Sequence, residues 1–268
     1  MKEIAYVRQM KVPRRLSSNA TSFEQDHIPQ LSIDCVIFGY HEKQLKIICT
    51  RIDGMKDWLL PGGFIRNNED IDDAALRILE ERTGVTDLYL NQFRTFGKKD
   101  RNKHNPRQLA EIRQLAFGDG NMINWVTKRF VTIGYYALTE YSKVSLQPGL
   151  LESECAWFDV HDLPPLMLDH YEIFSEAFAT LQYRLHHEPI GLNLLSSKFT
   201  LPELQSLYET ILEKKLDQRN FTKKLISLDL IRKLKEKKYI GGHRSPSLYK
   251  FNRPKYNAAL KKGIELAF

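Results

Sequence analysis

The chain has 268 residues, a mass of 31.3 kDa, 42% hydrophobic and 27% charged residues, and a net charge of +7. No apolar stretch reaches the roughly 18 residues that span a bilayer, and the N-terminal segment lacks the apolar block of a signal peptide, so we expect a cytoplasmic protein without a membrane partner. Three cysteines without CxxC spacing exclude a disulfide framework and a structural zinc site, while the basic balance leaves a nucleic-acid partner open.

Most of the chain has the pattern of an α/β (α+β) domain in which strands and helices are mixed. Residues 1–30 show no sustained periodicity, and we expect them to form a flexible N-terminal arm. Between 101 and 128 the pattern breaks into a polar insertion, which we interpret as a surface excursion with one short helix at 107–117. The expected strands are 31–40, 45–52, 88–97, 129–138 and 154–160, and the expected helices are 71–82 and about 169–186.

The last quarter of the chain changes in character. Thr200, followed by Pro202 and Glu203, predicts a capped helix, and Asp217 predicts the start of a second one at DQRNFTKKLISL. Strands are expected at LIRKLKEKKYI and LYKFN, around the turn GGHRSPS. Two helices followed by a hairpin are typical of a winged helix-turn-helix domain.

The same segment holds the excess of positive charge. Residues 196–268 contain 17 Lys and Arg against 7 Asp and Glu, a net charge of +10, whereas the other 195 residues hold 23 basic and 26 acidic side chains, a net charge of −3. A basic domain of this shape favours binding of double-stranded DNA over a merely solubilising surface.

The second helix of this domain is the expected reader of DNA. Phe221, Leu225 and Leu228 share one face at 100° per residue, so the opposite face is free to enter a major groove. Glycines at the hairpin turn would let that turn approach the sugar–phosphate backbone. The predicted DNA-binding residues are Arg219, Asn220, Thr222, Lys223, Lys224 and Ser227 on the helix, with His243 and Arg244 at the turn.

The segment 63–85, GFIRNNEDIDDAALRILEERTGV, resembles the Nudix box, whose pattern is G, five residues, E, seven residues, then R-E-U-x-E-E-x-G-U with U aliphatic. The resemblance implies a Nudix-like α/β/α sandwich with a mixed sheet. The matching positions are Gly63, Glu69, Arg77, Leu79, Glu81, Gly84 and Val85.

Two positions depart from the pattern in a way that changes the expected chemistry. The resemblance implies that three glutamates hold a divalent metal in active members of the family. Here Ile78 and Arg82 replace two of these glutamates, and only Glu81 remains. Glu80 lies about 100° around the helix from Glu81 and cannot substitute. We therefore expect no bound metal, no cofactor, no catalytic residues and no hydrolase activity, with Glu69 and Arg77 in structural roles.

A damaged box joined to a basic winged helix resembles the Nudix-related transcriptional regulators of the NrtR type, including their sugar-responsive AraR-like relatives. The resemblance implies a homodimeric repressor of carbohydrate or NAD-related metabolism. Its effector-binding domain would span residues 31–188 and its DNA-binding domain residues 189–268. The implied partners are operator DNA and a small effector, which could be a sugar, a sugar phosphate or an ADP-ribose-like sugar nucleotide. The candidate effector-binding residues, chosen near strand ends around the box, are Asp34, Arg51, Trp58, Phe64, Arg66 and Lys98.

Two other functions are consistent with the sequence. The first is a Nudix hydrolase of the ADP-ribose pyrophosphatase type with residual metal-dependent activity, in which Glu69, Glu80 and Glu81 serve as acids. The second is a protein-interaction module with a solvated basic tail. Loss of the metal ligands argues mildly against a diphosphate, because its charge would go partly uncompensated, and favours a sugar or sugar derivative as the effector.

Overall fold

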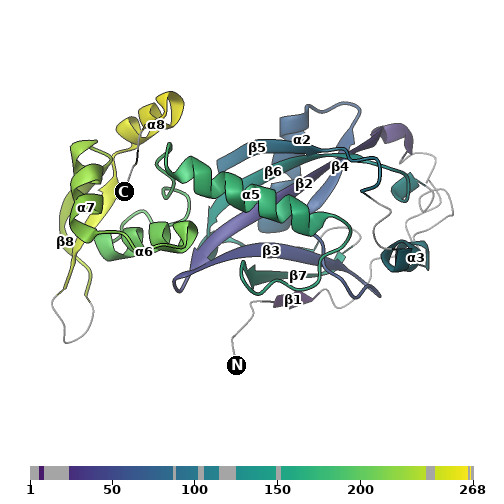
Figure 1. Ribbon diagram of the computed structural model, residues 1–268, viewed down its shortest axis with the longest axis horizontal. Helices are drawn as coiled ribbons and strands as arrows, with labels where there is room; N and C mark the ends of the chain where they lie inside the picture. Colours follow the sequence, from purple (N-terminus) through teal and green to yellow (C-terminus); the bar gives the residue numbers. More distant parts are fainter. Residues whose placement is uncertain are drawn as a thin grey trace. The chain divides into compact units, whose positions relative to one another are not determined.

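The computed structural model (Figure 1) forms two compact units. The first unit takes most of the chain up to Ala177, and the second takes residues 178–268 together with the short segments 39–45 and 139–142. The expected boundary between 188 and 189 therefore differs from the division by contacts. The structure describes residues 6–8, 24–86, 89–101, 106–114, 125–148, 152–239, 245–264 and 266.

A seven-stranded mixed sheet organises the first unit. The strands run in the order β1-β7-β3-β2-β6-β5, and β4 pairs with β2 off this path. The helix α5 crosses the near face of the sheet and α2 lies behind it (Figure 1), which gives the expected α/β/α sandwich. The strands are β1 (Tyr6–Arg8), β2 (His27–His41), β3 (Gln44–Ile52), β4 (Gly62–Arg66), β5 (Tyr89–Phe96), β6 (Val131–Glu140) and β7 (Glu152–Asp159), and the helices are α2 (Ile71–Thr83), α3 (Pro106–Gln114) and α5 (His170–Leu185), with a 3-10 turn at Tyr141–Lys143.

The central strand β2 is buried without interruption from Ile33 to Gly39, because neighbouring elements cover both of its faces. It turns into β3 through Glu42 and Lys43, which both have positive φ, as the tightest hairpin turns require. This hairpin, the helices α2 and α5, and strands β5, β6 and β7 confirm the elements expected from the sequence.

Two expectations about the strands of this unit need correction. The strand β4 was not expected, and it forms because Gly62, Gly63 and Phe64 pair antiparallel with Asp34, Ile33 and Ser32 of β2. The expectation of a flexible arm over residues 1–30 is wrong at two places, because β1 pairs with β7 and β2 begins at His27. Residues 1–5 and 9–23 lie outside the described part of the chain.

The described residues of the insertion after Arg101, at 106–114 and 125–128, do not form a surface excursion. Its expected helix is present as α3, but Arg101, Gln108 and Trp125 are buried. Gln108 donates to Asp57 at 2.6 Å and accepts from the backbone N–H of Leu168 at 2.8 Å, so α3 packs against the domain.

The second unit holds the expected winged helix. Its helix α6 (Leu201–Leu212) begins at a complete capping box between Thr200 and Glu203, and α7 (Gln218–Ser227) begins at Asp217, whose side chain accepts from the backbone N–H of Asn220. The strands β8 (Ile231–Lys237) and β9 (Ser247–Phe251) pair antiparallel. Both helices and both strands confirm the expectation. The helix α8 (Arg253–Lys262) was not expected from the sequence.

The helices of the winged helix are held by one apolar core. Leu204, Tyr208 and Ile211 of α6 are buried, and the Tyr208 ring lies 5.2 Å from the Phe221 ring of α7 in an edge-to-face contact. Leu225 is fully buried as well. Leu228, the third residue of the expected buried face, ends the helix and is only half-buried.

Candidate functional site

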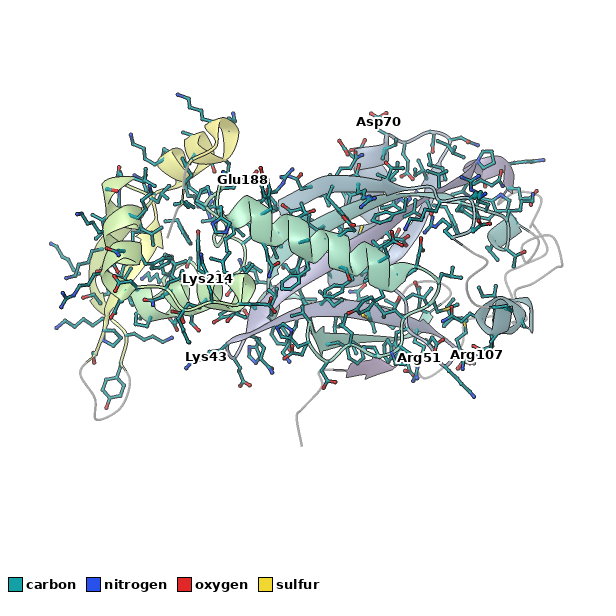
Figure 2. All side chains as sticks on the ribbon, viewed as in Figure 1. Lys43, Arg51, Asp70, Arg107, Glu188 and Lys214 are labelled. Atoms are coloured by element: carbon teal, nitrogen blue, oxygen red, sulfur yellow. The ribbon has the colours of Figure 1, made fainter. Side chains whose placement is uncertain are left out.

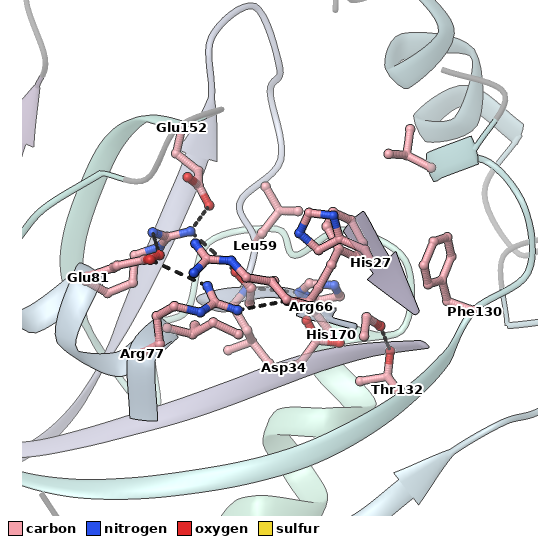
Figure 3. A pocket seen from close by; sticks show the side chains of 18 of the residues that line it. His27, Asp34, Leu59, Arg66, Arg77, Glu81, Phe130, Thr132, Glu152 and His170 are labelled. Atoms are coloured by element: carbon pink, nitrogen blue, oxygen red, sulfur yellow. Dashed lines mark hydrogen bonds and ion pairs between the residues drawn. The ribbon is translucent and has the colours of Figure 1, made fainter. Parts of the chain in front are cut away.

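A cavity of about 970 Å³ opens in the first unit beside the segment 63–85. Strands β2 and β4, the helix α2 and residues of the insertion line it, and Figure 3 shows Arg66, Arg77, Glu81, Glu152 and His170 around it. A volume of this size suits a ligand larger than a single sugar.

Arg77, which lines the cavity, forms an ion pair with Glu69 within the box. Arg77 donates to both carboxylate oxygens of Glu69, at 2.9 Å from Nε and 2.6 Å from Nη2, and its Nη2 also donates to the carbonyl of Phe64 at 3.0 Å. The hydrogen bond from Arg77 lowers the pKa of Glu69. Both residues thus tie the start of α2 to β4, which agrees with the structural roles expected for them.

The three positions of the damaged box have different surroundings. Ile78 is buried, and its side chain packs against Gly63. Glu80 is exposed and lies outside the cavity lining, whereas Glu81 lines the cavity. Arg82 is buried, and its Nη2 donates to Glu152 at 3.0 Å and to the carbonyl of Gly62 at 3.3 Å.

The Nudix box implies a divalent metal, and the residues present do not fit one. Within the described residues, no group of three or more His, Cys, Asp or Glu side chains is placed to hold a metal ion. Ile78 offers an alkyl group and Arg82 a positive charge at two positions where the pattern has carboxylates.

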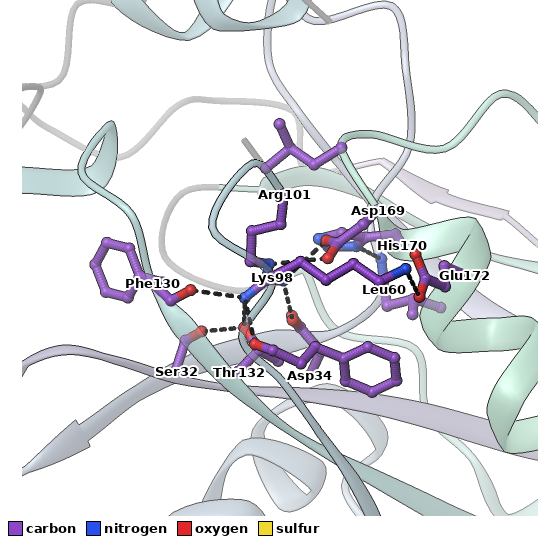
Figure 4. A network of polar contacts seen from close by, with 12 residues as sticks. Ser32, Asp34, Leu60, Lys98, Arg101, Phe130, Thr132, Asp169, His170 and Glu172 are labelled. Carbon is purple, nitrogen blue, oxygen red and sulfur yellow. Dashed lines mark hydrogen bonds and ion pairs between the residues drawn. The ribbon is translucent and has the colours of Figure 1, made fainter. Parts of the chain in front are cut away.

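A buried arginine, Arg101, also lines the cavity and holds a network of polar contacts (Figure 4). Arg101 binds Asp169 with two hydrogen bonds of 2.8 Å, and its Nη1 donates to Thr132 at 2.5 Å and to the carbonyl of Phe130 at 3.2 Å. Asp34 lies 3.9 Å from the same guanidinium. This network fixes the start of the insertion against β6 and the residue before α5.

Aromatic side chains form another part of the cavity lining and its surroundings. The Phe64 ring lies 4.6 Å from Trp125 and 5.5 Å from Phe130, and Trp125 contacts Phe130 edge to face at 5.0 Å. His27 lies 6.3 Å from Phe64. Phe64 is half-buried, so an aromatic surface is available beside the charged groups.

The six candidate effector-binding residues separate into two groups. Asp34, Phe64 and Arg66 line the cavity, and the other three lie outside its lining. Arg51, labelled in Figure 2, is paired with Glu154 and lies over the buried Trp58 ring at 4.8 Å. Lys98 is exposed and pairs with Glu172 at 2.6 Å (Figure 4).

Several lining residues were missed by sequence reasoning. Arg101, Thr132, Glu152 and His170 are supplied by four separate segments, and no spacing relates them to the box. His170 accepts a hydrogen bond from the backbone N–H of Leu60 at 2.9 Å, so it also holds the segment before β4. Only the unusual buried charge of Arg101 could have marked it, and burial is not visible in sequence.

The outward face of α7 is the second candidate site. Arg219, Asn220, Lys223 and Ser227 are exposed, as expected. Thr222 and Lys224 are half-buried at the flanks of the helix, and Ser227 donates to the carbonyl of Lys224. In the part of the chain that the structure describes, Arg219 and Lys223 have no ion-pair partner, so their charges face solvent. The predicted residues His243 and Arg244 lie outside the described residues.

Comparison with known families agrees with this architecture. Residues 29–177 match the NUDIX domain, and residues 191–251 match the NrtR DNA-binding winged helix domain. A protein of Acinetobacter baylyi described as an ADPR responsive transcriptional repressor is 27% identical over 245 residues, which cover 88% of each chain. No helix among the described residues is long and apolar enough to cross a membrane.

Two solved structures are similar to most of the chain. The NrtR of Shewanella oneidensis, solved with a 27mer DNA, is 28% identical with a TM-score of 0.66 over 85% of this chain and 96% of its own. A MutT/nudix family protein from Enterococcus faecalis is 24% identical with a TM-score of 0.60 over 84% of this chain and 88% of its own, and it shows the fold alone. The chain therefore belongs to the Nudix family and carries, after its Nudix domain, a winged helix domain of the NrtR type.

Proposed function

We propose that this protein is a transcriptional repressor that binds operator DNA through α7 and responds to ADP-ribose bound in the cavity of its Nudix domain. The observation that carries the proposal is that one chain combines a helix α7, whose exposed Arg219 and Lys223 have no ion-pair partner among the described residues, with a cavity of about 970 Å³ in a Nudix domain. The A. baylyi relative is named for its response to ADPR, and the S. oneidensis relative was solved with DNA.

The cavity supports a nucleotide-sized effector over a free sugar. Arg66 offers a cationic group for a phosphate, the half-buried Phe64 offers a stacking surface for a base, and Asp34 offers an acceptor for a sugar hydroxyl. We propose these three as effector contacts. Arg51, Trp58 and Lys98, whose side chains lie outside the lining, would act on the effector only indirectly.

The protein acts, in this proposal, as a homodimer in the cytoplasm. A two-fold dimer places two recognition helices about one helical turn of DNA apart. ADP-ribose weakens DNA binding only if its affinity differs between the dimer geometry that binds DNA and the geometry that does not. The box does not hydrolyse the effector, because Ile78 and Arg82 stand where the pattern has carboxylates.

DNA binding is tested with a double variant of α7. Fluorescence anisotropy with a duplex from the region upstream of the protein's own gene should show tight, salt-dependent binding that ADP-ribose weakens. Arg219→Ala with Lys223→Ala should abolish specific binding and reduce the slope of log K against log salt by about 2, since each lost phosphate contact removes about 0.9.

A charge-matched control separates a specific effect from a general one. Lys56→Ala with Lys99→Ala removes two exposed cations from the first unit and should leave DNA binding within about twofold of wild type. Equal losses in both double variants would contradict α7 as the reader. Binding that is unaffected by ADP-ribose would refute the effector assignment and leave the DNA assignment standing.

The competing hydrolase function is tested separately. A residual hydrolase would release phosphate-containing products from ADP-ribose with magnesium at an ordinary rate, and Glu81→Gln would abolish this release. We expect no such turnover in the wild-type protein.

A further inference from the structure

Three oxygen atoms from separate elements surround the guanidinium of Arg82. Its Nη2 lies 3.0 Å from Glu152 Oε1 of β7 and 3.3 Å from the carbonyl oxygen of Gly62 in β4, and its Nη1 lies 3.8 Å from Glu81 Oε2 of α2. The side chains of Arg82 and Glu152 are 8% and 12% exposed. One buried cation in the lining of the cavity is thus held by two carboxylates and a carbonyl.

This donor set is the kind that hard divalent cations prefer. Carboxylate and carbonyl oxygens are the usual protein ligands of Mg²⁺ and Ca²⁺. Here the oxygens already face a positive charge, and a second cation entering the cluster would be repelled by that charge in a place with little water to screen it. Arg82 and a divalent metal therefore exclude each other.

The arginine also leaves unused hydrogen-bonding capacity next to the cavity. Within the described residues the Nε of Arg82 and the Oε2 of Glu152 are buried and have no hydrogen-bond partner. Buried polar atoms in this state are costly. Arg66, which lines the same cavity and is exposed, adds a second cationic group for an anion.

We propose that Arg82 is the resident cation of the box: it occupies the place of a divalent metal and lets the pocket bind a phosphate-bearing ligand without any metal ion. The part that concerns the ligand rests on the proposed function. The part that concerns metal exclusion does not, because it depends only on the cluster of Gly62, Glu81, Arg82 and Glu152.

Metal exclusion is tested by titrating the protein with Mn²⁺ and measuring the free ion by electron paramagnetic resonance. The wild-type protein should show no saturable site at concentrations where Arg82→Glu and Arg82→Gln each gain one site per chain. Glu152→Gln added to Arg82→Glu should weaken the new site at least tenfold. Lys99→Glu, which makes the same charge change at an exposed position, should gain no site.

The proposal can be overturned even if one of the variants does not fold. A saturable, stoichiometric Mn²⁺ site in the wild-type protein overturns the proposal without any variant. Failure of folded Arg82→Gln to gain a site, with circular dichroism as the check on folding, overturns it as well.

The ligand arm uses ADP-ribose and isothermal titration calorimetry. Wild-type affinity should be the same in EDTA and in Mg²⁺, whereas Arg82→Gln should lose roughly tenfold or more in EDTA, the usual effect of removing a charged hydrogen bond, and recover part of it in Mg²⁺. A wild-type requirement for Mg²⁺ refutes metal-free binding. If ADP-ribose does not bind the wild-type protein at all, the proposed function fails, and the Mn²⁺ titration still decides the role of Arg82.

Discussion

Gly62 offers a sharp test of how the pocket is built, because a single methyl group there has no room. Gly62 pairs with Asp34 across β2 and β4, and the backbone N–H of Cys35 donates to the carbonyl of Pro61 at 2.8 Å. A Cβ atom at Gly62 would lie 2.6 Å from Asp34 Oδ1 and 2.7 Å from the carbonyl oxygen of Ile33. The Asp34 carboxylate can rotate away, but the Ile33 carbonyl belongs to the central strand and cannot.

The expected cost follows from that difference. Relief of a 2.7 Å contact requires β4 to move away from β2, which strains the ladder and disturbs the carbonyl of Gly62 that accepts from Arg82. Overpacking of this kind costs about 1–3 kcal/mol. We therefore expect Gly62→Ala to lower the free energy of unfolding of the Nudix domain by this amount and to weaken ADP-ribose binding, since β4 carries Phe64 and Arg66.

Urea denaturation followed by circular dichroism measures the change, and Gly97→Ala is the matched control. A Cβ at Gly97 would meet only the Val131 methyl groups, at 3.7 and 3.8 Å, which is ordinary contact. This control should stay within about 1 kcal/mol of wild type, with a small gain possible from the stiffer unfolded chain. Equal stability of the two variants, with unchanged ADP-ribose affinity, would refute the reasoning.

Two further predictions concern the winged helix. Phe221→Ala removes a ring that is 1% exposed and packs on Tyr208; the cost of about 3–5 kcal/mol should unfold this domain, abolish DNA binding in anisotropy assays and spare ADP-ribose binding in calorimetry. The backbone N–H of Leu216 lowers the pKa of Glu209 from its ordinary 4.5, so its stabilising contribution is complete above about pH 4.5 and is lost as pH falls through the lower folded value. Glu209→Gln should flatten this part of the stability against pH curve, and an unchanged curve would contradict the assignment.

The elements that the sequence predicted correctly are those whose sequence patterns lie within a few neighbouring residues. Thr200 and Glu203 lie three residues apart and form the capping box at which α6 begins. Asp217 does the same for α7. The missed strand β4 holds two glycines and is a strand only because β2 lies beside it. The missed helix α8 is strongly basic and is fixed by the burial of Tyr256 and Ala259, which composition does not reveal.

The candidate site was predicted only in part for a related reason. Asp34, Phe64 and Arg66 lie on strands that the box itself positions, and they line the cavity. Arg101 and Trp125 reach the same region from an insertion that folds back through Gln108 and Asp57. Contacts between segments so far apart in the chain are set by tertiary packing, and hydrophobic periodicity carries no information about them.

Arg82 shows how such a distant contact changes the meaning of a substitution. Sequence alone presents it as a cation repelling a cation, a defect in a metal site. The structure supplies what the box does not contain: Glu152, seventy residues later in the chain, whose carboxylate pairs with Arg82 at 3.0 Å. A buried arginine without such a partner would cost several kcal/mol, whereas a paired one leaves the charge pattern of the site intact with a guanidinium in place of an ion. In the proposal, the guanidinium of Arg82 takes the place of a metal ion, so the pocket can bind a phosphate-bearing ligand and release it unchanged.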